Sequence, residues 1–187
     1  MGHPLANDDR LLTIAEFEQL PEEGAYRIEL VRGRLIRSRG PASLHGVLAA
    51  RLVHRLVEFV DEGGHGVVLA GAGVVLARNP DTVRIPDVAF FSAQRIPETA
   101  YATAFWGPPD LTVEITSPSN RVSEIQEKVA DYVDAEVRMV WVVDAPSRTV
   151  TVYRSTGAAR LLRQHDVLEG DDVLPGFRLP LTPFFAL

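Results

Sequence analysis

Residues 110–128, DLTVEITSPSNRVSEIQEK, constrain the fold more than any other part of the chain. Apolar and polar residues alternate over 111–116, which is the period-two pattern of a β-strand. Residues 117–120, Ser-Pro-Ser-Asn, then predict a turn, because proline cannot donate to a strand ladder and serine and asparagine favour turns. A helix should follow, beginning near Ser123 with Gln126 completing a capping box. Its apolar residues recur at helical spacing on one face: Ile125, Val129, Tyr132 and Val133.

Residues 138–143, which follow this unit, predict how its strand is connected within a sheet. Residues 138–143, RMVWVV, are almost wholly apolar, which is typical of a strand covered on both faces. Strand, helix and strand in this order predict a right-handed βαβ crossover with two parallel strands. Before it, we expect a short helix opened by a Thr13–Glu16 capping box and a hairpin of strands at 26–30 and 35–37 around Arg32-Gly33. A long helix should span 44–61, with further strands over 67–76, 82–91 and 149–154.

These elements together predict an α/β or α+β fold. A mixed β-sheet would carry the long helix on one face and the crossover helix on the other. The chain has 187 residues, 46% of them apolar, so we expect a single domain over residues 11–187 and a loose N-terminus over residues 1–10.

Composition limits the chemistry and the environment. There is no cysteine, which excludes disulfides and thiolate metal sites and favours a cytoplasmic location. No apolar run approaches the roughly 20 residues needed to cross a bilayer. The net charge of −6 gives no general attraction to nucleic acid, so any binding of DNA must come from a local basic patch.

The predicted hairpin contains the best candidate for such a patch. It holds five arginines: Arg27, Arg32, Arg34, Arg37 and Arg39. They fit a solvated strand face as well as a surface that contacts a phosphate backbone. Arg34 and Arg37 are our candidate substrate contacts.

At the other end of the chain, the apolar residues 180–187 should either pack on the domain or form a dimer interface through Phe184 and Phe185.

Two carboxylates and one ammonium are the candidate reactive groups. Asp87 interrupts the apolar face of its predicted strand, so it should be paired, hydrogen-bonded or bound to a metal. Glu114 lies in the middle of the strand at 111–116. Lys128 lies at the margin of the apolar face of the crossover helix, so its ammonium should reach back toward Glu114, while Glu127 and Asp131 point toward water. Lys128 is also the only lysine among 19 basic residues, which indicates that a compact ammonium is needed there.

These groups suit phosphodiester hydrolysis. Carboxylates on adjacent strands can hold Mg²⁺, with the carbonyl of Ile115 as a further ligand. Such a metal activates water and neutralises a phosphoryl oxygen, and an ammonium can orient the water or stabilise the transition state. The alternative is purely structural, with a buried salt bridge between Asp87 and Lys128 and with Glu114 on a solvated face.

The order Pro86-Asp87, Glu114-Ile115-Thr116 and Lys128 resembles the PD-(D/E)XK nucleases, the restriction-endonuclease-like superfamily. More narrowly, RIPDVAFF, PPDLTVEITSPSNR, EKVADY and MVWVVDAPSRTVTVYR resemble the Uma-two family of restriction endonucleases, over about residues 11 to 180. The usual motif has its lysine two residues after the second acid, where this chain has Thr116. The resemblance therefore implies that the lysine has moved to the following helix.

The resemblance implies a restriction-endonuclease-like core and a Mg²⁺-dependent endonuclease that cuts DNA as a homodimer, with Mn²⁺ able to substitute. Asp87 and Glu114 would ligate the metal, and Lys128 would serve as the lysine of the motif. Glu29 would add a further acidic group and His45 a substrate contact. By pattern alone, Glu29 equally fits a solvent-facing position and His45 a structural one. A catalytically silent nucleic-acid-binding or accessory protein of the same fold is the alternative function.

Overall fold

The structure of the protein, a computed structural model, describes residues 10–21, 24, 26–39, 43–100, 102–117 and 121–186. The expected loose tail, except for Arg10, lies outside these ranges, as do three of the four residues of the expected turn at 117–120 and the side chain of Arg39. Across the part of the chain that the structure describes, no helix is both long and apolar enough to cross a membrane.

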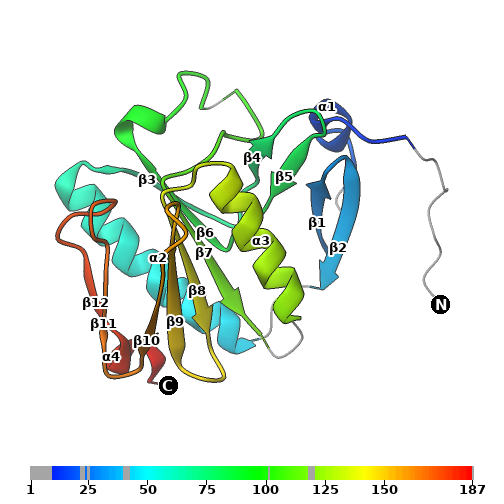
Figure 1. Cartoon of the computed structure of the whole chain (residues 1–187). Coiled ribbons are helices and arrows are strands. Elements are labelled where there is room, and N and C mark those ends of the chain that lie inside the picture. The colour runs from blue at the N-terminus through cyan, green and yellow to red at the C-terminus, as the bar shows by residue number, and fades with distance from the viewer. Residues whose placement is uncertain are drawn as a thin grey trace.

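Runs of consecutive strands, separated by a few helices, make up most of the chain (Figure 1). The helices are α1 (Ile14–Phe17), α2 (Ser43–Gly63), the short 3₁₀ helix η1 (Ala93–Arg95), α3 (Val122–Asp134) and α4 (Leu181–Phe185). The strands of the first half are β1 (Tyr26–Val31), β2 (Arg34–Arg39), β3 (Gly66–Ala70), β4 (Val74–Ala77), β5 (Thr82–Arg84) and β6 (Val88–Ser92). Those of the second half are β7 (Leu111–Thr116), β8 (Met139–Asp144), β9 (Thr149–Arg154), β10 (Ala159–Arg163), β11 (Val167–Glu169) and β12 (Arg178–Pro180).

The central sheet has the order β10-β9-β8-β7-β6-β3 and is mixed. Strand β7 pairs with β8 in parallel, with Glu114 opposite Val142, and the other neighbours are antiparallel. Helix α3 connects β7 to β8, so the predicted βαβ crossover is confirmed. A second sheet, β2-β1-β5-β4, contains the predicted hairpin, and β11 pairs with β12. The predicted α+β class is therefore confirmed.

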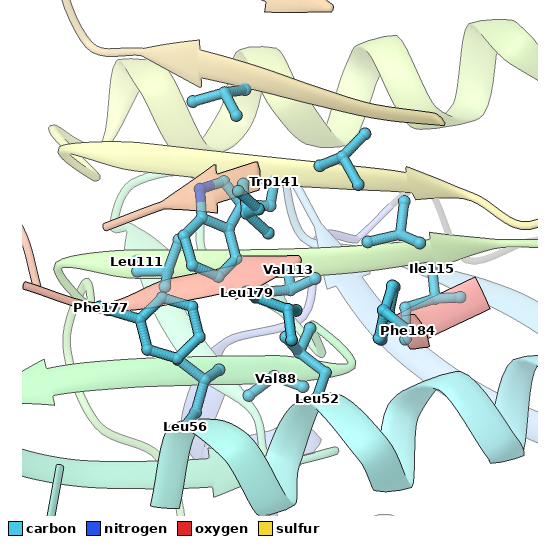
Figure 2. Packing of buried hydrophobic residues seen from close by; sticks show 14 of the residues in the cluster. Leu52, Leu56, Val88, Leu111, Val113, Ile115, Trp141, Phe177, Leu179 and Phe184 are labelled. Atoms are coloured by element: carbon cyan, nitrogen blue, oxygen red, sulfur yellow. The ribbon is translucent and has the colours of Figure 1, made fainter. Parts of the chain in front are cut away.

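Helices cover both faces of the central sheet, as predicted (Figure 1). One core lies between the sheet and α2, where Leu52 and Leu56 face Val113 on β7 and Trp141 on β8 (Figure 2). The opposite core contains Val129 and Tyr132 of α3 with Val140 and Val142 of β8. Because residues alternate along β7, Val113 points toward α2 and Glu114 points toward α3.

The expected strand over 82–91 is wrong, because the chain changes sheets in the middle of it. Residues 82–84 form β5 in the small sheet, and residues 88–92 form β6 in the central sheet. Pro86 lies in the break and lacks a backbone N–H for a ladder. Asp87 therefore sits where the two sheets meet rather than in mid-strand. The expected strand over 67–76 divides in the same way around Gly71, whose φ of 62° departs from strand geometry.

Of the two predicted capping boxes, the structure confirms the first and contradicts the second. The Thr13–Glu16 capping box is present at the start of α1. Helix α3 begins at Val122, earlier than predicted, and the backbone N–H of Arg121 donates to the Glu124 carboxylate at 3.2 Å. The predicted capping box at Ser123 is wrong. Arg121 is the N-cap of α3, and Glu124, three residues later, accepts the backbone N–H of this N-cap.

The apolar C-terminal end packs on its own domain. Phe184 and Phe185 contact each other in α4 and are 4% and 6% exposed. A guanidinium N–H of Arg51 on α2 donates to the carbonyl of Phe184 at 2.9 Å. Of the two expectations for this segment, packing is the one that the structure supports.

Candidate functional site

A cavity of about 350 Å³ opens between the hairpin, α3 and the end of β7. It collects the predicted Asp87, Glu114 and Lys128, and with them most of the other candidates. The lining residues are Arg27, Glu29, Val31, Ile36, Arg37, Ser38, His45, Arg84, Asp87, Glu114, Ile115, Ser117, Glu124, Ile125, Glu127 and Lys128. Arg34 is exposed on β2 and does not line the cavity.

Asp87 is buried at the junction of the two sheets, where three donors hold its side chain. Arg27 donates to Oδ1 at 2.8 Å, the backbone N–H of Ile115 donates to Oδ2 at 2.7 Å, and His45 Nε2 lies 2.8 Å from the same oxygen. Burial by itself raises the pKa of the Asp87 carboxyl, but the bonds and charges of His45, Ile115 and Arg27 outweigh it and lower the pKa. Asp87 is therefore a fixed, ionised carboxylate.

Glu114 projects from the face of β7 that meets α3. Tyr132 donates its hydroxyl to Oε1 at 2.6 Å, and Lys128 Nζ lies 3.1 Å from each carboxylate oxygen. Burial raises the pKa of Glu114; Lys128 opposes this rise, while Asp87 and Glu29 add to it. Three carboxylates thus meet in one small space, and Glu114 is the one among them that ionises least readily.

Lys128 reaches back from α3 toward Glu114, as the sequence predicts. Its Nζ also lies 3.0 Å from Oε1 of Glu29, so a single ammonium bridges acids on β1 and β7. The side chain is 15% exposed, and the residue lines the cavity. Burial lowers the pKa of Lys128, but the charges of Glu114 and Glu29 more than offset it and raise the pKa, so the ammonium stays protonated.

Glu29 is buried, which decides between the two positions that its pattern allowed. Its Oε1 accepts the backbone N–H of Ile85 at 2.8 Å, and its Oε2 accepts an N–H of Arg84 at 3.0 Å. Burial raises the pKa of Glu29, and Lys128, Arg84 and the Ile85 amide outweigh that effect and lower it. Arg84 also donates from Nε and Nη2 to Oδ2 of Asp131, at 2.8 and 2.6 Å.

The structural alternative drawn from the sequence does not match these contacts. Among the described residues, Lys128 pairs with Glu114 and Glu29, whereas Asp87 pairs with Arg27 and His45. Glu114 is 4% exposed and is not on a solvated face. The expectation that Asp131 points toward water is also wrong, because Arg84 from the small sheet covers it.

The hairpin arginines divide between the two roles considered for them. Arg27 lies beside Asp87 and Arg37 lines the cavity. Arg32 lies at the turn and contacts Asp131 at 3.2 Å, and Arg34 is exposed. The hairpin therefore brings positive charge to the cavity through Arg27 and Arg37 rather than through a uniform basic face.

Oxygen donors at this site fit a small divalent cation. A carboxylate offers about four acceptor positions, and the described partners use three on Asp87 and three on Glu114. Ile115 follows Glu114 in the chain, donates its backbone N–H to Asp87 and lines the same cavity. Within the described ranges, no group of three or more histidine and acidic side chains is arranged to hold a metal ion. A site with two carboxylates suits Mg²⁺, which keeps several waters in its shell.

The sequence pattern does not reveal the site contacts of four residues: Arg27, Arg84, Asp131 and Tyr132. Tyr132 was assigned to the apolar face of α3, which is correct for its ring but gives no indication of its hydroxyl contact. Arg84 is 4% exposed yet lies in a predicted strand among apolar residues. That position was the one available signal, since a charged residue inside an apolar strand requires a buried partner.

Comparisons with known proteins place the chain in a family. Residues 14–182 match the Uma2 (Uma-two) family, described as "Putative restriction endonuclease". The fold matches a crystal structure described as a "putative nuclease belonging to DUF820" from Anabaena variabilis, with a TM-score of 0.82 and 21% identity. That match covers 93% of this chain and 97% of the other. No match was found among curated proteins. Since the family match spans nearly the whole chain, this protein belongs to the Uma2 family of restriction-endonuclease-like proteins.

Proposed function

We propose that this protein is a metal-dependent endonuclease that hydrolyses phosphodiester bonds of DNA. The observation that carries the proposal is the convergence of two buried carboxylates, Asp87 and Glu114, with the only lysine of the chain in one cavity. A binding protein without catalysis has no need to bury Glu29 and Glu114 around the Lys128 ammonium with Asp87 in the same cavity, because each buried charge costs desolvation energy.

Asp87, Glu114 and the carbonyl of Ile115 would hold Mg²⁺ or Mn²⁺. When bound, such a metal supplies a water of lowered pKa and neutralises charge on a phosphoryl oxygen. Asp87 suits this role because its Oδ2 is fixed by a backbone N–H and by His45, which leaves Oδ1 beside the cavity with Arg27. Glu114 is fixed in turn by Tyr132 and Lys128.

Lys128 would act on the reacting phosphate through its ammonium. Glu29 and Glu114 keep it protonated and hold it at the cavity wall, so it presents positive charge where negative charge develops on the phosphate. In the reaction, a bond forms between water oxygen and phosphorus while a bond between phosphorus and a sugar oxygen breaks. The water loses one proton and the sugar oxygen gains one.

Arg27 and Arg37 are the proposed phosphate contacts of the substrate. Both line the cavity from the hairpin, and Arg27 is 26% exposed at its side chain. His45 lines the same cavity from the start of α2, beside Asp87. We assign two roles to His45: it holds Asp87 in place, and it forms part of the cavity wall that the substrate contacts. Arg34, which does not line the cavity, would contact only DNA that extends beyond it.

The test is nicking of supercoiled plasmid at low salt with Mg²⁺, Mn²⁺ or EDTA, using wild type, Asp87→Asn and Lys128→Met. We expect metal-dependent nicking in the wild type and a loss of about 100-fold or more in each variant, because each removes a group that stabilises the transition state. Circular dichroism and thermal melting show whether the variants remain folded.

Calorimetric titration with Mn²⁺ and fluorescence anisotropy with a labelled duplex separate the alternatives. DNA binding without nicking or metal binding in the wild type would contradict the proposal and support a silent accessory protein. Mn²⁺ binding that is lost in Asp87→Asn, together with no nicking, would retain the metal site and reject DNA as the substrate.

A further inference from the structure

We propose that Arg84 and Asp131 are positioning residues that set the place of the Lys128 ammonium. The inference rests on the proposed function, since it assigns how the catalytic lysine is held. Arg84 comes from β5 of the small sheet, and Asp131 comes from α3, which also carries Lys128. Neither belongs to the acid–acid–lysine pattern from which the site was predicted.

The contacts form a closed ring of buried charges. Asp131 Oδ2 accepts two N–H groups of Arg84, Arg84 Nη1 donates to Glu29 Oε2 at 3.0 Å, and Glu29 Oε1 lies 3.0 Å from Lys128 Nζ. Lys128 and Asp131 lie three residues apart on α3, so the helix itself closes the ring. The side chains of Arg84, Glu29 and Asp131 are each 8% exposed or less.

Arg84 determines which oxygen of Glu29 faces the lysine. All three nitrogens of its guanidinium are bonded to carboxylates, so Arg84 has a fixed orientation although it lines the cavity. By taking Oε2 of Glu29, it leaves Oε1 for Lys128 and for the Ile85 amide. A methionine at this position would leave Oε2 without its cation, and Glu29 could then turn both oxygens toward Lys128 and draw the ammonium away from Glu114.

The ring also links the two sheets across the cavity. Glu29 and Arg84 belong to the small sheet, and Glu114 belongs to the central sheet. Lys128 is the one side chain of the ring that contacts acids on both sheets. Its ammonium position therefore depends on how α3 is fastened to the small sheet. The buried Asp131–Arg84 pair at 2.6 Å makes that connection, together with an exposed Arg32 side chain 3.2 Å from Asp131.

The first readout is independent of activity. Because Lys128 is the only lysine, growth on ¹⁵N-lysine labels one Nζ in the whole protein. We expect a visible ammonium signal in the wild type, since burial and two carboxylates protect its protons from exchange. In Arg84→Met the signal should shift or broaden. Arg138→Met is the matched control, because it removes an arginine that pairs with buried Asp110 away from the cavity.

The second readout is kinetic. We expect Arg84→Met to lower kcat for plasmid nicking about 10- to 100-fold, as removal of a supporting partner typically does, while KM stays unchanged. Asp131→Asn keeps an oxygen that can accept from Arg84 and should lower kcat less. It also replaces Arg84→Met as the test variant if the latter does not fold. Arg138→Met should retain the wild-type kcat.

The outcomes separate this inference from the proposed function. An unchanged Lys128 signal in Arg84→Met and in Asp131→Asn would overturn the positioning role. A changed signal with wild-type kcat would also overturn it. A changed signal in a protein whose wild type does not nick DNA would uphold the placement of Lys128 by Arg84 and reject the nuclease proposal alone.

Discussion

At the scale of single residues, the site depends on how a few buried charges share partners. Lys128 contacts both Glu29 and Glu114, and Asp87 contacts both Arg27 and His45. Each of the three acids, Glu29, Asp87 and Glu114, has more than one partner. Removal of one member should therefore affect its neighbours, since double-mutant effects within such networks are not additive.

Tyr132 gives a residue-scale prediction. It is fully buried and donates to Glu114 Oε1 at 2.6 Å. Tyr132→Phe should lower the free energy of unfolding by about 1–3 kcal/mol, because a buried charged acceptor loses a donor. Urea unfolding measures the change. Tyr26→Phe, at a side chain that is half exposed, should change stability by less than about 0.5 kcal/mol. Equal effects at the two positions would contradict the role of the Tyr132 hydroxyl.

At the scale of elements, local rules account for the faces of strands and for the start of α1, but not for where strands are interrupted. The alternation over β7 correctly places Glu114 on the face of the strand that points away from the α2 core, because side chains of a strand alternate between its faces. The same rule fails over residues 82–91, where the chain leaves one sheet and joins another at Pro86. A period-two pattern continues through such a break, so the pattern cannot reveal it.

The start of α1 gives a prediction for pH. The Thr13 amide, Arg10 and the Thr13 hydroxyl lower the pKa of the Glu16 carboxyl from 4.5 to about 2. Because the folded-state pKa is depressed, this group's contribution to stability is present above pH 4.5 and disappears as pH falls through about 2. NMR titration of the Glu16 side chain should show this midpoint, and Arg10→Ala should move it upward. A midpoint near 4.5 in the wild type would refute the capping box.

At the scale of the whole molecule, the site lies where two sheets and a helix meet. The small sheet contributes Glu29, Arg27 and Arg84, the central sheet contributes Glu114, and Asp87 lies on the connection between the sheets. Binding at such a junction should stabilise the entire fold, because unfolding separates all of the ligands. The expected homodimer stays a prediction, which light scattering tests. Phe184 and Phe185, the residues expected at its interface, are buried in their own chain.

Metal linkage gives the whole-molecule prediction. At free Mg²⁺ 100 times its Kd, the free energy of unfolding should rise by about 2.7 kcal/mol, and EDTA should remove the increase. Asp87→Asn should lose most of this increment because a ligand is missing. Thermal melting with and without Mg²⁺ measures it. A similar increment in wild type and Asp87→Asn would show that the ion binds elsewhere.

The sequence by itself determined the βαβ crossover, the two helix-covered faces and the return of Lys128 toward Glu114. These features follow from local periodicity, since a strand repeats every two residues and a helix every 3.6. Strand periodicity also indicated Asp87, and the family pattern added Glu29 and His45 as candidates.

Beyond the Lys128–Glu114 pair, only the tertiary structure decided which charges meet. Asp131 and Glu127 both looked solvent-facing on α3, but Asp131 is covered by Arg84, which lies 47 residues earlier in the chain. Arg27 reaches Asp87 across 60 residues in the same way. The physical reason is that a buried charge is tolerated only with a partner, and the partner is supplied by whichever element packs opposite, which no local pattern specifies.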